Sequence, residues 1–191
     1  MKSINGYFIA QSLIHVAKKV EENKDYLCEL DGEVGDGDHG VSMTIGMRAV
    51  ARAMKSLDES VLPSEVFQAA GEAFADDVGA TIGPLYEAAF AAAATAAANK
   101  DALNNISDWA DLYEAMATSI QLLGKAELGD KTMLDSFFPA VEHIKSLSTK
   151  DLVPKKGRAA RLGERAIGFQ DAGATSLAII LQGIADSFDG A

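Results

Sequence analysis

Apolar residues in this sequence recur every three or four positions, and this helical period limits the possible folds more than any other feature. Runs of alternating β-branched residues, which would indicate strands, do not occur. The period first appears over residues 4–23, where Ile9, Leu13 and Val20 share one apolar stripe. It returns in later segments, at residues 39–57, 63–78, 84–98, 108–123, 131–147, 158–167 and 173–188. The sequence therefore predicts an all-α fold with seven to eight helices.

The connections between these predicted helices are short, and most of them contain glycine. Short connections place neighbouring helices antiparallel in a bundle. No internal repeat and no linker-like composition divides the chain, so we expect a single domain over residues 1–191.

Composition and charge narrow the class of protein. Hydrophobic residues make up 48% of the chain, which indicates a globular protein, and the net charge is −11. A surface this acidic repels nucleic acid and anionic membranes, so we expect neither as a partner. Because Cys28 is the single cysteine, no intramolecular disulfide can form, and we expect a cytoplasmic protein. The same charge would repel a nucleotide unless cations lay between carboxylates and phosphates.

The most unusual segment is an acidic loop with the sequence DGEVGDGDHG at residues 31–40. Its three aspartates, Asp31, Asp36 and Asp38, are interleaved with glycines. Magnesium takes oxygen ligands and usually lies between one or two carboxylates and the phosphates of a substrate. The end of the loop opens a predicted helix, whose N-terminal amides favour a phosphate group. The loop is therefore a candidate metal and phosphate site.

Three other interpretations of this loop compete with a metal site. Residues 35–40 match G-x-G-x-x-G literally, but no strand precedes them, which excludes a dinucleotide-binding βαβ unit. An EF-hand that began at Asp36 would need a glutamate where the sequence has Met47. The remaining interpretation, in which the acids cap the next helix and otherwise face solvent, stays open.

Further glycine-rich breaks occur at residues 79–83, 124–133 and 157–176. Each break alone is compatible with a simple turn that uses glycine to end a helix. If the breaks gather at the end of the bundle that holds the acidic loop, a glycine-lined opening would meet a methionine for a base ring and an arginine for phosphate. No Walker A motif and no protein-kinase motif occurs, and no serine or cysteine nucleophile is evident.

Three motifs together resemble the L subunits of dihydroxyacetone kinases over nearly the whole chain. They are GDGDHG at 35–40, GDKTM at 129–133, and GRA…LGERAIG…QD…GATS at 157–176. The resemblance implies a barrel-like antiparallel bundle that holds ADP or ATP at one end through two Mg²⁺ ions on Asp31, Asp36 and Asp38. It also implies a set of residues that line the nucleotide pocket: His39, Gly40, Val41, Ser42, Thr81, Ile82, Gly83, Gly124, Met133, Arg158, Asp171, Ala172 and Gly173.

The resemblance further implies a phosphotransferase of glycerol metabolism whose active site is shared between chains. A separate K subunit would hold the ketose, dihydroxyacetone or a similar sugar, and no residue of this chain would act as a base toward it. Two donors stay open, an exchanging ATP and a resident ADP recharged by a phosphotransferase-system protein. Erythrulose as the acceptor, a nucleotide-sensing module without catalysis, and a homodimer also stay open.

The sequence departs from the family pattern at several positions. Ile82 stands where a serine is frequent, Ser42 where an asparagine is frequent, and Ala172 where a proline is usual. A larger departure lies at residues 147–156, which are too few for the helix that relatives place there. Either this helix is lost or residues are missing from the sequence, and the motifs leave both alternatives open.

Overall fold

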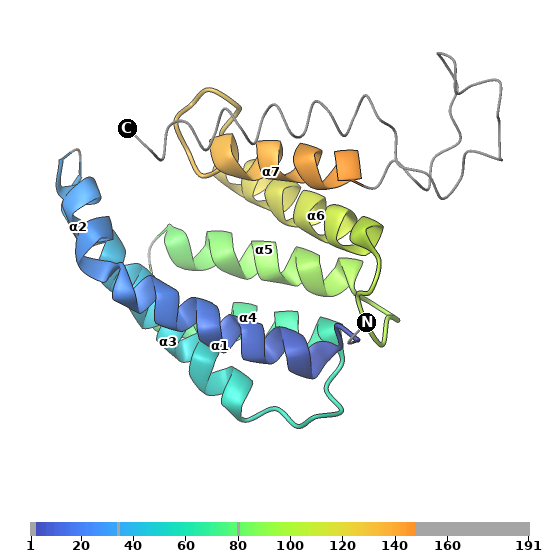
Figure 1. The fold of residues 1–191 in the computed structure, drawn as a ribbon. Helices are drawn as coiled ribbons and strands as arrows, with labels where there is room; N and C mark the ends of the chain where they lie inside the picture. The colour runs from blue at the N-terminus through green and yellow to red at the C-terminus, as the bar shows by residue number, and fades with distance from the viewer. Residues whose placement is uncertain (1–2, 34, 80, 148–191) are drawn as a thin grey trace, which may run out of the picture.

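The computed structural model describes residues 3–33, 35–79 and 81–147, and its regular elements are seven α-helices (Figure 1). The helices are α1 (Gly6–Glu22), α2 (Lys24–Gly32), α3 (His39–Lys55), α4 (Pro63–Asp77), α5 (Ile82–Ala96), α6 (Ile106–Gly124) and α7 (Leu134–Leu147). Within these residues the β-structure is limited to one isolated bridge between Asn5 and Ala102. The prediction of an all-α fold is confirmed.

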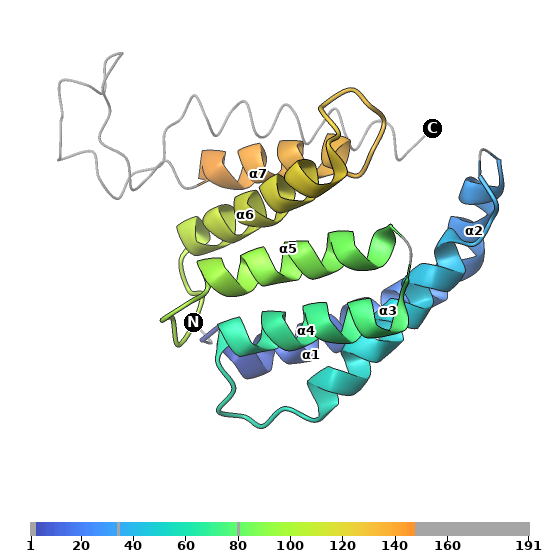
Figure 2. The same ribbon diagram turned by 180° about the vertical axis from the view of Figure 1, so that it is seen from behind.

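Successive helices from α3 to α7 run antiparallel and lie side by side (Figures 1 and 2). Helix α4 packs between α3 and α5, α5 packs between α4 and α6, and α7 covers α6, while α1 lies against α3 and α4. This order leaves the α2–α3, α4–α5 and α6–α7 connections at one end of the bundle in both views. We call it the loop end, and we call the other end, with the α3–α4 and α5–α6 connections, the strap end.

The core forms where the apolar stripes of neighbouring helices meet. All four inward positions that the sequence predicts for α3, which are Met43, Met47, Val50 and Met54, are buried. Small residues let the helices approach closely, because a Cβ atom at Gly46 would overlap Cε2 of the Phe74 ring. The alanines of α5 act in the same way, and those on its inner face are fully or almost fully buried: Ala89 and Ala93.

The strap end is fixed by hydrogen bonds between the chain start and the α5–α6 connection. The Leu103 amide donates to the Ile4 carbonyl at 2.9 Å, and the Ile4 amide donates to Asn104 Oδ1 at 3.0 Å. The indole of Trp109 donates to the Leu103 carbonyl at 3.0 Å, and the Leu103 side chain is fully buried. An ion pair at 2.7 Å between Lys100 and Asp108 adds to these contacts.

Helix α2 corrects the sequence analysis, which expected no helix between residues 23 and 39. Helix α1 ends because Asn23 leaves the helical conformation and its side chain donates to the Lys19 carbonyl at 2.8 Å. The chain then resumes as α2, which has no buried residue and therefore gives only a weak apolar signal. Asp31 consequently lies in the last turn of α2 rather than at the end of the first helix.

Two further boundaries differ from prediction for reasons that the contacts explain. Helix α6 begins at Ile106, before the predicted residue 108, because the Asp108 carboxylate accepts the Asn105 amide and caps the helix. Helix α7 begins at Leu134, after the predicted residue 131, because Gly129 and Lys131 have positive φ angles of 96° and 60°. The helices predicted over 158–167 and 173–188 lie outside the described residues. None of the helices that the structure describes has the length and apolar character needed to cross a membrane.

Candidate functional site

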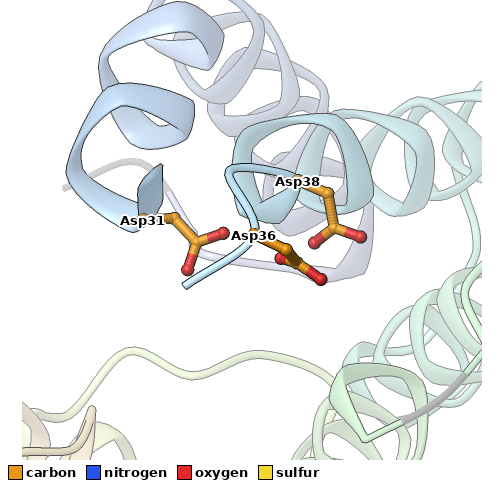
Figure 3. A group of neighbouring side chains, drawn as sticks. All are labelled: Asp31, Asp36 and Asp38. Carbon is orange, nitrogen blue, oxygen red and sulfur yellow. The ribbon is translucent and has the colours of Figure 1, made fainter. Parts of the chain in front are cut away.

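The acidic loop joins α2 to α3 and brings its three aspartates together (Figure 3). Asp31 comes from the last turn of α2, Asp36 from the loop, and Asp38 from the position before α3. One carboxylate oxygen of each residue lies within 4.8 Å of the others, and Asp36 and Asp38 are exposed to solvent. The predicted grouping of these side chains at one point is therefore observed in the fold.

The electrostatic environment of Asp38 is set mainly by the other carboxylates of the cluster. Among the described residues, no Lys or Arg forms an ion pair with Asp31, Asp36 or Asp38. The negative charge of Asp36 is the main cause that raises the pKa of Asp38 above its ordinary value, and Asp31 adds to the effect. The fold thus holds like charges together at a cost that a bound cation would remove.

Helix capping explains one of these carboxylates but not the others. The His39 amide, at the start of α3, donates to Asp31 Oδ2 at 3.2 Å. Asp38 occupies the N-cap position of α3, yet its side chain makes no capping hydrogen bond. The simple interpretation of three helix-capping acids therefore accounts for Asp31 but not for Asp36 and Asp38.

Glycines give the acidic loop its shape. Gly37 has a φ angle of 77°, which only glycine adopts readily and which turns the chain between Asp36 and Asp38. A Cβ atom at Gly40 would overlap the Lys24 carbonyl oxygen and lie 2.8 Å from Cys28 Sγ. The first turn of α3 therefore packs directly against α2, and this contact brings Asp31 to the α3 N-terminus.

The α4–α5 connection presents a second set of predicted residues at the loop end. Thr81 is exposed and precedes α5, and Ile82 is half-buried as the first residue of the helix. Gly83 is buried, and a Cβ atom there would overlap the Val78 carbonyl oxygen. A tight turn without side-chain bulk therefore brings the start of α5 close to the end of α4.

The α6–α7 loop, residues 125–133, is the third element at the loop end. Gly124 closes α6, and a Cβ atom there would lie 3.5 Å from Leu85 in the first turns of α5, so this loop and the start of α5 are neighbours. Met133 is exposed just before α7. The Asp135 carboxylate accepts the amides of Gly129 at 2.6 Å and Thr132 at 2.8 Å.

The structure brings most of the predicted site residues to one end of the bundle. His39, Gly40 and Ser42 lie in the first turn of α3 beside the acidic cluster, and Val41 is exposed in the same turn. The remaining predicted residues lie outside the described part of the chain: Arg158, Asp171, Ala172 and Gly173. Sequence reasoning missed Asp135, although a lone aspartate in the first turn of a helix after a glycine-rich loop is a recognisable signal for amide binding.

Comparison with known proteins decides the family. The model of the DAK2 domain matches residues 33–148 and 146–186. This chain belongs to the DAK2 domain family. The two matched segments meet at the start of residues 147–156, the stretch that the sequence analysis found too short.

Relatives of known function agree with the DAK2 assignment. The ADP-binding subunit DhaL of PEP-dependent dihydroxyacetone kinase 2 from Listeria innocua is 35% identical, over 91% of this chain and 90% of its own length. The ADP-binding subunit DhaL of the PTS-dependent dihydroxyacetone kinase from Lactococcus lactis is 38% identical, over 86% and 88% respectively. The resemblance to dihydroxyacetone kinase L subunits is therefore confirmed over almost the full length of both relatives.

A solved structure agrees with the fold of this DAK2 chain. The dihydroxyacetone kinase from C. freundii, in complex with AMP-PNP and Mg²⁺, matches with a TM-score of 0.61 and 24% sequence identity. The match covers 98% of this chain and 35% of that one, so this chain spans about a third of the longer kinase. At this identity the likeness supports the fold alone.

Proposed function

We propose that this chain is the nucleotide-binding L subunit of a dihydroxyacetone-type kinase, a cytoplasmic phosphotransferase subunit that forms one domain over residues 1–191. The observation that carries the proposal is the cluster of Asp31, Asp36 and Asp38 at the N-terminus of α3, in a chain of the DAK2 family. The names of its relatives as ADP-binding subunits support the same ligand.

The acidic cluster fits Mg²⁺ by its chemistry. All three donors are carboxylates, their oxygens lie within 4.8 Å of one another, and two of the three side chains are open to solvent, where a phosphate can complete the coordination. Two Mg²⁺ ions held here would neutralise phosphate charge during phosphoryl transfer. The raised pKa of Asp38 agrees with this role, because its main cause is the neighbouring negative charge of Asp36, which a bound cation would offset.

The remaining side chains of the loop end would bind the nucleotide. We assign the phosphates to the amides of the first turn of α3, from His39 to Ser42, where the helix dipole favours an anion. We assign the base to the space between Thr81, Ile82 and Gly83 of the α4–α5 connection and Gly124 and Met133 of the α6–α7 loop. Residues carried over from the family pattern complete the proposed pocket: Arg158, Asp171, Ala172 and Gly173.

The acceptor would be held by another protein. We propose that a K subunit holds dihydroxyacetone or a similar short ketose, and that this chain supplies the phosphoryl donor without acting as a base. Catalysis then rests on positioning and on charge neutralisation, which are the main contributions that phosphoryl transfer needs from a protein. Relatives named PEP-dependent and PTS-dependent favour a resident ADP that a phosphotransferase-system protein recharges.

Reconstitution tests this function directly. The purified chain with ATP, Mg²⁺ and dihydroxyacetone should give no product, and addition of a ketose-binding K subunit with a phosphoryl-donor protein should give dihydroxyacetone phosphate. Erythrulose in the same assay identifies the preferred acceptor. Turnover by the chain alone would refute the division of labour between subunits, and magnesium-dependent ADP binding without any partner-dependent turnover would favour a nucleotide-sensing module.

The source of the donor has its own test. A resident coenzyme should remain with the protein through gel filtration and appear as bound ADP when the purified protein is denatured. Loss of the nucleotide on the column, combined with turnover supported by free ATP, would favour an exchanging donor.

A further inference from the structure

Two carboxylates hold the α6–α7 loop: Asp130 accepts the Glu127 amide at 2.7 Å, and Asp135 accepts two amides closer to Met133. Asp135, in the first turn of α7, accepts the Gly129 amide at 2.6 Å through Oδ1 and the Thr132 amide at 2.8 Å through Oδ2. Leu128 is 60% exposed, whereas Ala126, nearer to α6, is partly buried against the cluster of Ala89, Ile120 and Leu134. The part of the loop from Gly129 to Thr132, next to Met133, is therefore held by polar contacts with Asp135.

The loop backbone has an unfavourable conformation at several positions. Lys125, Gly129 and Lys131 all have positive φ, at 55°, 96° and 60°, and two of them carry side chains that disfavour it. Gly129 and Lys131 lie in the segment whose Gly129 and Thr132 amides Asp135 accepts, whereas the Lys125 amide donates to the Gln121 carbonyl and ends α6. Hydrogen bonds from the Gly129 and Thr132 amides to its two carboxylate oxygens lower the pKa of Asp135.

We infer that Asp135 is a positioning residue for nucleotide binding, which fixes the α6–α7 loop so that Met133 meets the base. This inference rests on the proposed function and assigns base recognition to one loop. Thr132 and Leu134 lie on either side of Met133, and each amide is held, the first by Asp135 and the second by Thr132 Oγ1 at 3.2 Å. These two hydrogen bonds hold the backbone on both sides of Met133, and its side chain, 37% exposed, starts from a fixed position at the loop end. The acidic cluster, on α2 and α3, is built without this loop.

Asparagine at position 135 keeps the shape of the side chain but replaces one acceptor oxygen with an NH₂ group that faces an amide. Asp135→Asn should therefore release the loop and weaken ADP binding in Mg²⁺ by about tenfold, the loss expected for a charged hydrogen bond. Pyrophosphate with Mg²⁺ needs only the acidic cluster and α3, so its affinity should not change. A purely structural role would weaken both ligands equally.

Asp58 offers a matched control at the strap end. Its carboxylate also holds a loop, by accepting the Ser60 amide at 2.8 Å and the Ser60 hydroxyl at 2.6 Å, and its pKa is lowered by these bonds. Asp58→Asn should leave the affinities for ADP and pyrophosphate unchanged. Calorimetric titration of the full chain and of both variants measures all of these affinities.

The outcomes separate this inference from the proposed function. Unchanged ADP affinity in Asp135→Asn, or equal loss for ADP and pyrophosphate, would overturn the role of Asp135 while the function stands. Absence of magnesium-dependent ADP binding in the wild type would instead overturn the function. A second measurement needs no variant: ADP with Mg²⁺ should shift the amide resonances of Gly129 and Thr132 in the wild type, and pyrophosphate with Mg²⁺ should not. Shifts with both ligands or with neither would also overturn the inference.

Discussion

The two ends of the bundle differ in how their polar and charged groups are paired. At the strap end, Leu103 is fully buried, its backbone is tied to Ile4 and Trp109, and the charge of Lys100 is matched by Asp108. At the loop end, Asp31, Asp36 and Asp38 face one another without a positive partner among the described residues. Paired contacts stabilise the fold, whereas clustered like charges can be compensated by a bound ligand. The contrast separates residues that maintain the bundle from residues that we propose to bind.

The largest expected effect is the loss of nucleotide binding at the acidic cluster. Asp36→Asn and Asp38→Asn should each weaken magnesium-dependent ADP binding by at least about a hundredfold, because even the loss of an outer-shell partner costs 10–100-fold in metal affinity. Without metal, Asp38→Asn should raise Tm, because it removes like-charge repulsion. Calorimetric titration and melting in EDTA measure the two effects. If Asp38→Asn instead lowered Tm in EDTA and kept normal ADP affinity, Asp38 would stabilise the fold rather than bind the ligand.

The strap end should show the opposite behaviour. Leu103→Ala removes a fully buried side chain and should lower the free energy of unfolding by about 2–5 kcal/mol. Below the melting temperature, its affinity for ADP with Mg²⁺ should equal that of the wild type. Chemical denaturation and titration of the same sample check both statements, and a weakened affinity would mean that the two ends are coupled.

Glycines on one helix sharpen the comparison further. Gly40→Ala and Gly46→Ala both add a methyl group to α3 where there is no room, next to Lys24 and Phe74 respectively. Each should lower the free energy of unfolding by about 1–3 kcal/mol, as overpacking usually does. Only Gly40→Ala should also weaken ADP binding, because it pushes α2 and Asp31 away from the start of α3. Equal affinities in the two variants would show that α2 has no part in the site.

The smallest expected effect is a pH dependence at the strap end. Hydrogen bonds from Ser60 lower the pKa of Asp58 below the ordinary value of an aspartate, so its carboxylate stabilises the fold above that ordinary value. The contribution is lost as the pH falls through the lowered pKa. The difference in Tm between wild type and Asp58→Asn should be constant near neutral pH and disappear in acid. A difference that grew in acid would contradict this sign.

The sequence predicted the helices with strong apolar periods and the membership of the acidic cluster, because both depend on local spacing. Met43, Met47 and Val50 repeat on one face of α3 and are buried as predicted. Helix α2 was missed because it buries none of its residues, so no apolar stripe reveals it. The late start of α7 was missed because it depends on Asp135, whose contacts with residues 129 and 132 require the folded loop.

The local spacing of residues in the sequence also could not predict which residues far apart in the chain lie close together. The gathering of the α2–α3, α4–α5 and α6–α7 connections follows from the antiparallel order, which the short loops indicated. The contact between Gly124 and Leu85 depends on how α5 and α6 pack, and no period in the sequence contains it.

Magnesium dependence of ADP affinity in the wild-type chain is the most direct measurement of the central proposal. Titration of ADP in Mg²⁺ should give saturable one-site binding, and the same titration in EDTA should give none, because the net charge of −11 and the three clustered carboxylates then repel the phosphates. Equal affinity in Mg²⁺ and in EDTA would show that the nucleotide is held without cations on the acidic cluster, and would contradict the proposal.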